Sequence, residues 1–292
     1  MSLTIHTVKK LFGTDWFCLA QLDNTQINYL WNCVGEANKT SIDYSSSLAG
    51  SISSSLLMDD PSGILVREIL PSLLESNDIK ELVDDEISRS LRRFPALMQE
   101  GKFSFRLDEI WVNYQSKHEY NPIHDHAGLL SFAIWMRVPF MIENEDNVDH
   151  NLHSKSTTSA ASFGFIDSSA CVHMIRADKK FEGTICIFPS TLKHLVYPFF
   201  TSDEQRISIA GNISLGIHWD TPYRAMFNLY WILYGQIKIA MNPQSGKKQI
   251  LKNHYDDSTR ILFSLINRFQ VNNWYKPSTE YYSRLCRSAK KE

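Results

Sequence analysis

The chain has 292 residues, of which 43% are hydrophobic and 21% are charged, and its formal net charge is −2. This composition is typical of a soluble globular protein and excludes a uniformly charged polyelectrolyte binder. The length allows one large domain or two small ones with a sizeable core.

Charge is unevenly distributed along the chain. Residues 217–292 contain 12 basic and 5 acidic residues, a net charge of +7, whereas the rest of the chain has a net charge of −9. This asymmetry predicts an acidic partner for residues 217–292. Docking of the same residues on the acidic body of this chain explains it equally well.

Cysteine usage favours a reducing compartment. The five cysteines are odd in number, widely spaced and without a C-x-x-C pair, which argues against a disulfide framework or a zinc ribbon. The N-terminus has no apolar segment of signal-peptide length, and the chain has no run of about 18 apolar residues. We therefore expect a cytoplasmic protein without a membrane span.

Residues 1–100 are predicted to form a mostly helical flank. Asp60 can cap a helix whose first position is Pro61. The acidic residues 84–86 precede Ile87 and Leu91, which have the spacing of one helix face.

Residues 101–217 change to the alternating pattern of β-strands. Strands are expected near 103–114, 129–140, 162–166, 170–175, 183–188 and 206–213. Many short strands with turn residues between them favour a β-sandwich or barrel, and helices on one side of it make the fold class α+β. Residues 218–292 are predicted to form a basic, helical extension, since Ile261, Leu262 and Leu265 recur at helical spacing.

A pair of histidines precedes one of the apolar strands. His124 and His126 are two residues apart, so on a strand they share a face, whereas Asp125 points to the other. A third imidazole, His194, follows the strand predicted at 183–188. Three such ligands suit a facial iron site with open positions. The alternative is that each histidine is an ordinary hydrogen-bonded residue.

Arg206 and Ser208 open the strand that follows His194 and share one face of it. A guanidinium matches a carboxylate in bidentate fashion, and a hydroxyl can add a donor. These residues are therefore candidates to bind the distal carboxylate of a cosubstrate that chelates the metal. Tyr114, on the strand before the histidine pair, is a further candidate for lining this pocket.

These segments resemble the iron(II)/2-oxoglutarate-dependent oxygenases, and more narrowly the 2-oxoglutarate oxygenases of tailed phages of cyanobacteria. The resemblance rests on Trp111–Gln115, Asn121–His126, Glu182–Ser190, His194–Phe199 and Arg206–Asn212, and it covers residues of about 100–215. It implies a double-stranded β-helix core, of the jelly-roll or cupin-like type, at 101–217. The compartment would be the cytoplasm of a host cell if a phage encodes the chain.

The resemblance also implies cofactors and roles. Fe(II) would be bound by His124, His126 and His194, and 2-oxoglutarate by Arg206 with Ser208, with O2 as the second cosubstrate. The activity implied is a dioxygenase that hydroxylates an unknown primary substrate, prolyl-hydroxylase-like by family analogy. One departure stands out: the family has H-x-D at the first pair, and here the aspartate position is His126. A three-histidine site is less anionic and should hold iron(II) more weakly.

Two alternatives remain open at this point. The first is a three-histidine cupin dioxygenase, favoured by the spacing of Gly183, Pro189 and His194. It is opposed by the lack of a carboxylate in residues 127–138 and leaves Arg206 without a role. The second is a non-catalytic β-helix protein, a binding module or virion component, whose basic tail contacts nucleic acid or another protein.

Overall fold

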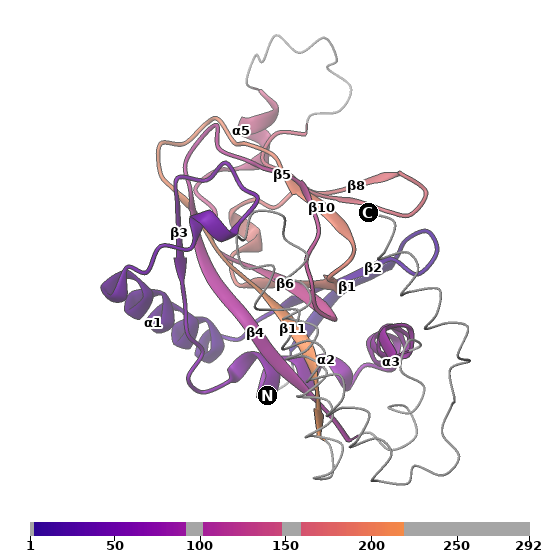
Figure 1. The fold of residues 1–292 in the computed structure, drawn as a ribbon. Helices are drawn as coiled ribbons and strands as arrows, with labels where there is room; N and C mark the ends of the chain where they lie inside the picture. Colours follow the sequence, from indigo (N-terminus) through magenta and orange to yellow (C-terminus); the bar gives the residue numbers. More distant parts are fainter. Residues whose placement is uncertain (1–2, 92–101, 148–158, 219–292) are drawn as a thin grey trace, which may run out of the picture. The chain divides into compact units, whose positions relative to one another are not determined.

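A computed structural model describes residues 3–91, 102–147 and 159–218 of the chain (Figure 1). The chain divides into two units, residues 1–218 and 219–292. The predicted basic extension, and with it the predicted acidic partner of residues 217–292, therefore lies outside the described residues except at its first positions.

Two antiparallel sheets form the body of the first unit. The larger sheet has seven strands in the order β1–β2–β9–β6–β11–β4–β3. In that order their bounds are Thr4–Lys10, Trp16–Gln21, Thr184–Pro189, Leu130–Arg137, Arg206–His218, Lys102–Gln115 and Ser54–Leu57. Figure 1 shows the long strands β4 and β11 side by side in this sheet.

The smaller sheet has four strands in the order β5–β10–β7–β8. Their bounds are Asn121–His124, Lys193–Val196, Phe163–Ile166 and Val172–Ile175. All pairs in both sheets are antiparallel. Mostly antiparallel sheets with few helices are consistent with a jelly-roll-like fold and with the expected class.

The helices of the first unit come mainly from its N-terminal part. They are α1 (Asn24–Thr40), the short turn η1 (Ser45–Ser47), η2 (Leu65–Ile69), α2 (Leu70–Leu74) and α3 (Asn77–Leu91), followed later by α5 (Ile142–Asp146) and η3 (Lys179–Phe181). Helix α1 begins with a capping box, in which Asp23 accepts from the Gln26 N–H and Gln26 accepts from the Asp23 N–H. No helix in the described part of the chain is long and apolar enough to cross a membrane.

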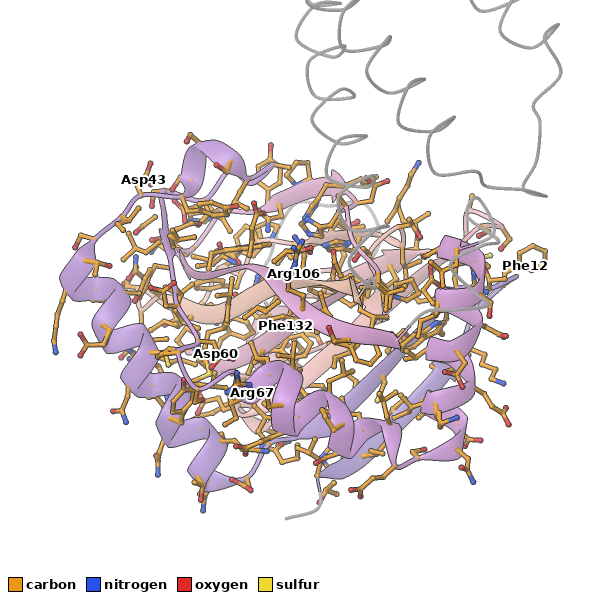
Figure 2. All side chains as sticks on the ribbon, turned by 60° about the horizontal axis from the view of Figure 1, so that its bottom comes forward. Phe12, Asp43, Asp60, Arg67, Arg106 and Phe132 are labelled. Atoms are coloured by element: carbon orange, nitrogen blue, oxygen red, sulfur yellow. The ribbon has the colours of Figure 1, made fainter. Side chains whose placement is uncertain are left out.

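Helices α1, α2 and α3 cover one face of the larger sheet, and side chains fill the space between them (Figure 2). Leu30 and Val34 of α1 pack in one core with Val112 of β4 and Ile209 of β11. Burial of this apolar face, rather than intrinsic propensity, is the main source of helix stability in such an arrangement.

A second core lies between the two sheets and is largely aromatic. Phe165 of the smaller sheet stacks on Phe17 of the larger sheet, with ring centroids 5.0 Å apart, and contacts Phe188 edge-on at 4.9 Å. Trp135 and Phe163 join the same cluster. This core therefore fastens the smaller sheet to the larger one.

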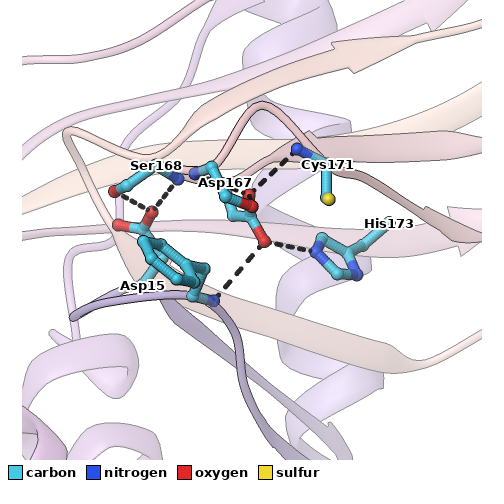
Figure 3. A network of polar contacts seen from close by, with 7 residues as sticks. Asp15, Asp167, Ser168, Cys171 and His173 are labelled. Carbon is cyan, nitrogen blue, oxygen red and sulfur yellow. Dashed lines mark hydrogen bonds and ion pairs between the residues drawn. The ribbon is translucent and has the colours of Figure 1, made fainter.

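Polar contacts tie the turn between β1 and β2 to the turn between β7 and β8 (Figure 3). Asp15 accepts from the backbone N–H and the hydroxyl of Ser168. Asp167 accepts from the Phe12 N–H and from Nε2 of His173, the latter at 2.7 Å. The two turns are about 150 residues apart in sequence, so this network connects the N-terminal hairpin to the smaller sheet.

Candidate metal centre

Three imidazoles converge at one end of the smaller sheet. His124 ends β5, His126 follows it, and His194 lies in β10. The ring centroid of His124 is 4.2 Å from that of His194, and His126 is 5.0 Å from each of the two. One nitrogen from each residue lies within 4.8 Å of the others, and no other such group of His, Cys, Asp or Glu occurs in the described ranges.

Backbone pairing brings these residues together. His194 is directly opposite His124 in the antiparallel pair of β10 and β5. The N–H of His126 donates to the Ser190 carbonyl at 2.9 Å, which holds the segment after β5 against the start of β10. Gly128 then takes a φ of +120°, where a Cβ would lie 3.2 Å from a backbone oxygen, so the turn into β6 requires glycine.

Asp125, between the two histidines, is exposed and lies in the wall of the same cavity. Strand β5 ends at His124, so strict alternation does not extend to it. Asp125 is not part of the converging group of nitrogens.

Local hydrogen bonds set the tautomers of two histidines. Nδ1 of His124 lies 2.8 Å from the Pro122 carbonyl oxygen, and Nδ1 of His194 lies 3.0 Å from the Leu192 carbonyl oxygen. A carbonyl only accepts, so each Nδ1 carries the proton and donates it. Each Nε2 is then left with a free lone pair, the form in which imidazole binds metals.

The site favours neutral imidazoles. Burial lowers the pKa of His194 to about 3, and His124 nearby lowers it further. Burial likewise lowers the pKa of His126 to about 4, and neighbouring His124 adds to the effect. His126 and His194 are thus uncharged at neutral pH. Three imidazole nitrogens converging at one point are a donor set that fits a divalent transition metal such as Fe(II).

The triad borders a cavity of about 210 Å³ between the two sheets. Its wall includes residues of the segment before β3, of β4, of β6 and of β11. They are Tyr44, Ser47, Leu48, Ala49, Gly50, Ile52, Glu109, Trp111, Asn113, Gln115, Asn121, Asp125, Phe132, Ala133, Trp135, Phe163, Phe188, Val196, Arg206, Ser208, Ala210 and Asn212.

Arg206 is a buried cation in this wall, with only 3% of its surface exposed. Its Nε and one Nη donate to Gln115 Oε1, and the other Nη donates to the Ala161 carbonyl at 3.0 Å. Its guanidinium carbon lies 5.9 Å and 5.8 Å from the ring centroids of Phe140 and Phe199. Burial lowers the pKa of Arg206 to about 10, which still leaves it charged at neutral pH.

No carboxylate among the described residues forms an ion pair with Arg206, and the charge of the buried Glu145 only partly offsets the effect of burial on its pKa. A buried guanidinium usually has an anionic partner, because an unpaired charge in the interior is costly. The neutral acceptors Gln115 and Ala161 leave part of its donor set unused. Arg206 can therefore bind a carboxylate that enters the cavity.

Ser208 lies in the same wall as Arg206, as the two-residue spacing predicts. Tyr114 is not brought to the cavity. It is on the opposite face of β4, where its hydroxyl donates to Asn38 of α1 and its ring packs on the core beneath the helices. The residues that face the cavity are its neighbours Asn113 and Gln115.

The pairing of β11 with β4 explains this parity. Arg206 is opposite Gln115 and Ser208 is opposite Asn113, whereas Tyr114 is opposite Ile207. Directly opposed residues in an antiparallel pair project to the same side. The alternating pattern of β4 showed that Asn113 and Gln115 share one face and that Tyr114 is on the other. Which of these two faces lines the cavity follows only from the pairing register of β4 with β11.

Asn212 is a further wall residue that sequence reasoning missed. Only 7% of it is exposed, and its Oδ1 accepts from the Ser131 hydroxyl at 2.8 Å. Ser131 Oγ also lies 3.0 Å from the hydroxyl of Ser190, whose carbonyl accepts from His126. No partner for the Asn212 Nδ2 occurs in the part of the chain that the structure describes, so this donor is available to the cavity.

One family model matches the segment of the chain that contains this site. Residues 109–212 match a family described as putative 2OG-Fe(II) oxygenase. This segment contains the three histidines, Arg206 and Ser208. The narrower resemblance to phage enzymes is not tested by this match and stays a prediction. No curated protein matches the chain.

Solved structures give distant likenesses. One is an oxidoreductase of the 2OG-Fe(II) oxygenase family from Burkholderia pseudomallei, at 13% identity and a TM-score of 0.28, over 42% of this chain and 50% of that one. This chain thus spans about half the length of that relative. Another is a prolyl-4-hydroxylase from Pseudomonas putida, at 11% identity and a TM-score of 0.34, over 68% of this chain and 91% of that one.

Proposed function

We propose that the chain is an iron(II)- and 2-oxoglutarate-dependent dioxygenase, an oxidoreductase of the 2OG-Fe(II) oxygenase family whose model residues 109–212 match. The observation that carries the proposal is the convergence of His124, His126 and His194 in the wall of a cavity with the buried Arg206, which forms no ion pair with a described residue. The antiparallel two-sheet body supports a double-stranded β-helix as the core that carries them.

In this proposal the three histidines hold the metal through their imidazole nitrogens, and burial keeps those of His126 and His194 uncharged at neutral pH. For His124 and His194 the backbone carbonyls of Pro122 and Leu192 fix which nitrogen is presented. Iron(II) with 2-oxoglutarate supplies the oxidising chemistry of the superfamily, in which O2 is consumed, the cosubstrate is decarboxylated to succinate and a substrate C–H bond is hydroxylated.

Arg206 binds the distal carboxylate of 2-oxoglutarate, and the Ser208 hydroxyl adds a donor. Gln115 orients the guanidinium by accepting from two of its nitrogens. Phe140 and Phe199 flank it and exclude water, which strengthens a charge-assisted hydrogen bond. The chain's contribution is thus to bind, orient and desolvate the reactants.

The test is iron and cosubstrate binding by the full chain, followed by succinate release in the presence of O2. Wild type should bind one iron(II) and convert 2-oxoglutarate to succinate. His194→Ala should lose iron, whereas the matched change His6→Ala, at an exposed histidine outside the cavity, should not. Arg206→Lys should keep iron and bind 2-oxoglutarate at least about tenfold more weakly, because a single ammonium cannot form the two parallel bonds of a guanidinium.

The proposal fails if purified wild type binds no iron(II), or if iron content and succinate release are unchanged in His194→Ala. Iron binding and substrate oxidation without any need for 2-oxoglutarate would instead favour the three-histidine cupin dioxygenase. A prolyl substrate, which family analogy suggests, stays a prediction.

A further inference from the structure

Two aromatic rings connect the rim of the cavity to the histidine triad. The ring of Tyr44 is 5.7 Å from that of Trp111, and Trp111 is 5.8 Å from the ring of His126. Tyr44 comes from the segment before β3 and Trp111 from β4. Both residues line the cavity, so a ligand that approaches the triad from this side passes their rings.

Glu109 lies in the same wall, two residues before Trp111 and therefore on the same face of β4. It is exposed. The pKa of the Tyr44 hydroxyl is raised to about 12, first by burial and then by hydrogen bonding to Glu109 and its charge. The carboxylate of Glu109 is therefore close to the aromatic pair.

No lysine or arginine among the described residues forms an ion pair with Glu109 or with Asp125, the other carboxylate in the wall. Asn212 is directly opposite Glu109 across β4 and β11. It is more than nine-tenths buried, and its amide Nδ2 has no partner among those residues. For a ligand that donates hydrogen bonds, the acceptor that this region offers is the Glu109 carboxylate, because the Asn212 Nδ2 can only donate.

The charges of the cavity wall are separated. Among the described residues that line it, the only lysine or arginine is the deeply buried Arg206, whereas the two carboxylates, Glu109 and Asp125, are exposed. In the proposed function Arg206 is occupied by the cosubstrate. What remains for the primary substrate is a negative rim with aromatic faces, which attracts a cation and disfavours an anion.

We propose that the primary substrate carries a cationic nitrogen group, an ammonium or guanidinium like that of a lysine or arginine side chain, which Glu109 binds against the rings of Trp111 and Tyr44. This inference rests on the proposed function and specifies its substrate class. The carbon chain attached to the cation then extends past Trp111 towards the triad. Specificity comes from pairing the Glu109 carboxylate with a cation, since no lysine or arginine among the described residues forms an ion pair with it.

The test uses three capped tripeptides as probes: acetyl-Gly-Lys-Gly-amide, the same peptide with Nε-acetyl-lysine, and acetyl-Gly-Pro-Gly-amide. Binding to the full chain is measured by calorimetry, both metal-free and anaerobically with iron(II) and 2-oxoglutarate. The lysine peptide should bind at least about tenfold tighter than either of the others, because a charge-assisted hydrogen bond and a cation–π contact are both lost on acetylation. The advantage should shrink with added salt.

Variants locate the contact. Glu109→Gln should weaken binding of the lysine peptide about tenfold and leave the proline peptide unaffected. Trp111→Leu should also weaken it, whereas Glu81→Gln, which removes an exposed carboxylate of α3, should have no effect. The inference is overturned if no probe binds, if the acetylated or proline peptide binds as tightly as the lysine peptide, or if Glu109→Gln changes nothing.

Failure of this inference is distinguishable from failure of the proposed function. Iron and 2-oxoglutarate binding are measured on the same preparations and do not involve Glu109. A protein that binds both but does not prefer the lysine peptide retains the proposed function and loses the cationic substrate. A protein that prefers the lysine peptide without binding iron retains the cation site and loses the oxygenase.

Discussion

Arg206 of β11 lies directly opposite Gln115 of β4, and two nitrogens of its guanidinium share the single Oε1 atom of Gln115. A neutral amide thus occupies the place where a carboxylate would neutralise the cation. The pairing orients the guanidinium without cancelling its charge, which is what binding of an external anion requires.

Gln115→Glu should therefore weaken 2-oxoglutarate binding. The new carboxylate would pair with Arg206 inside the cavity and repel the incoming anion, so we expect a loss of about tenfold or more. Calorimetry with iron(II) under anaerobic conditions measures the affinity. Gln205→Glu adds the same charge at a residue outside the cavity wall and should leave the affinity unchanged. Equal affinities for the two variants would contradict the assigned role of Arg206.

His126→Asp should strengthen iron(II) binding. The change replaces a neutral donor with a carboxylate and restores the H-x-D pattern of the family. We expect a gain of about tenfold, or about 1.4 kcal/mol, from the added negative charge. His126→Asn, whose new side chain has the shape of aspartate without its charge, should bind iron more weakly than wild type. A titration with iron(II) compares the affinities of wild type and the two variants. Similar affinities for the Asp and Asn variants would refute the charge argument.

Ser131→Ala should destabilise the fold and disturb the cavity. Ser131 is 1% exposed and connects Asn212 to Ser190, so its removal leaves buried polar groups without a partner. The expected loss is about 1–3 kcal/mol of unfolding free energy. Urea denaturation measures it, with the exposed Ser53→Ala as the control. A loss no larger than that of the control would mean that this chain of hydrogen bonds contributes little.

Asp167→Asn should change the acid sensitivity of the protein. Hydrogen bonds from His173 and then Ser169 hold the pKa of Asp167 well below its usual range. As the pH falls, Asp167 is therefore protonated in the unfolded chain before it is protonated in the folded protein. The stabilisation is complete above the ordinary pKa of about 3.9 and is lost as pH falls below it. The midpoint of unfolding, measured at pH values between 5 and about 2.5, should fall less steeply with decreasing pH for the variant than for wild type. Parallel curves of midpoint against pH for the two proteins would exclude a contribution from Asp167.

The strands of the core were largely predictable from the sequence. The alternation in residues 103–114 and 206–213 predicts β4 and β11, and both strands are confirmed. The H-x-H pair with His194 also identified three residues that do converge. Metal ligands are recognisable because they are few, polar and placed at strand ends, and their role remains the proposal made above.

Other elements were not predictable, for physical reasons. The run Trp16–Gln21 is almost continuously apolar because β2 is buried on both faces, and such a run does not distinguish a strand from a buried helix. Asp60 does cap backbone N–H groups, but those of Ile64 and Leu65, so the helix begins later than Pro61. The pairing register, which places Gln115 rather than Tyr114 in the cavity, arises from tertiary contacts that a single sequence does not reveal.

In strand β4, residues that stabilise the fold alternate with residues that line the cavity. Ile110, Val112 and Tyr114 face the helices, whereas Trp111, Asn113 and Gln115 face the cavity. Within residues 110–115, a saturation screen that scores protein abundance should therefore respond most to the even-numbered positions, whereas before the register shift of β4 it is Phe105 and Leu107 that pack on the same core. A screen that scores turnover should respond to the odd-numbered ones as well. Such a strand can change the lining of the cavity through alternate residues while the residues that pack against the helices stay the same, which gives this protein a route to new substrates on an unchanged fold.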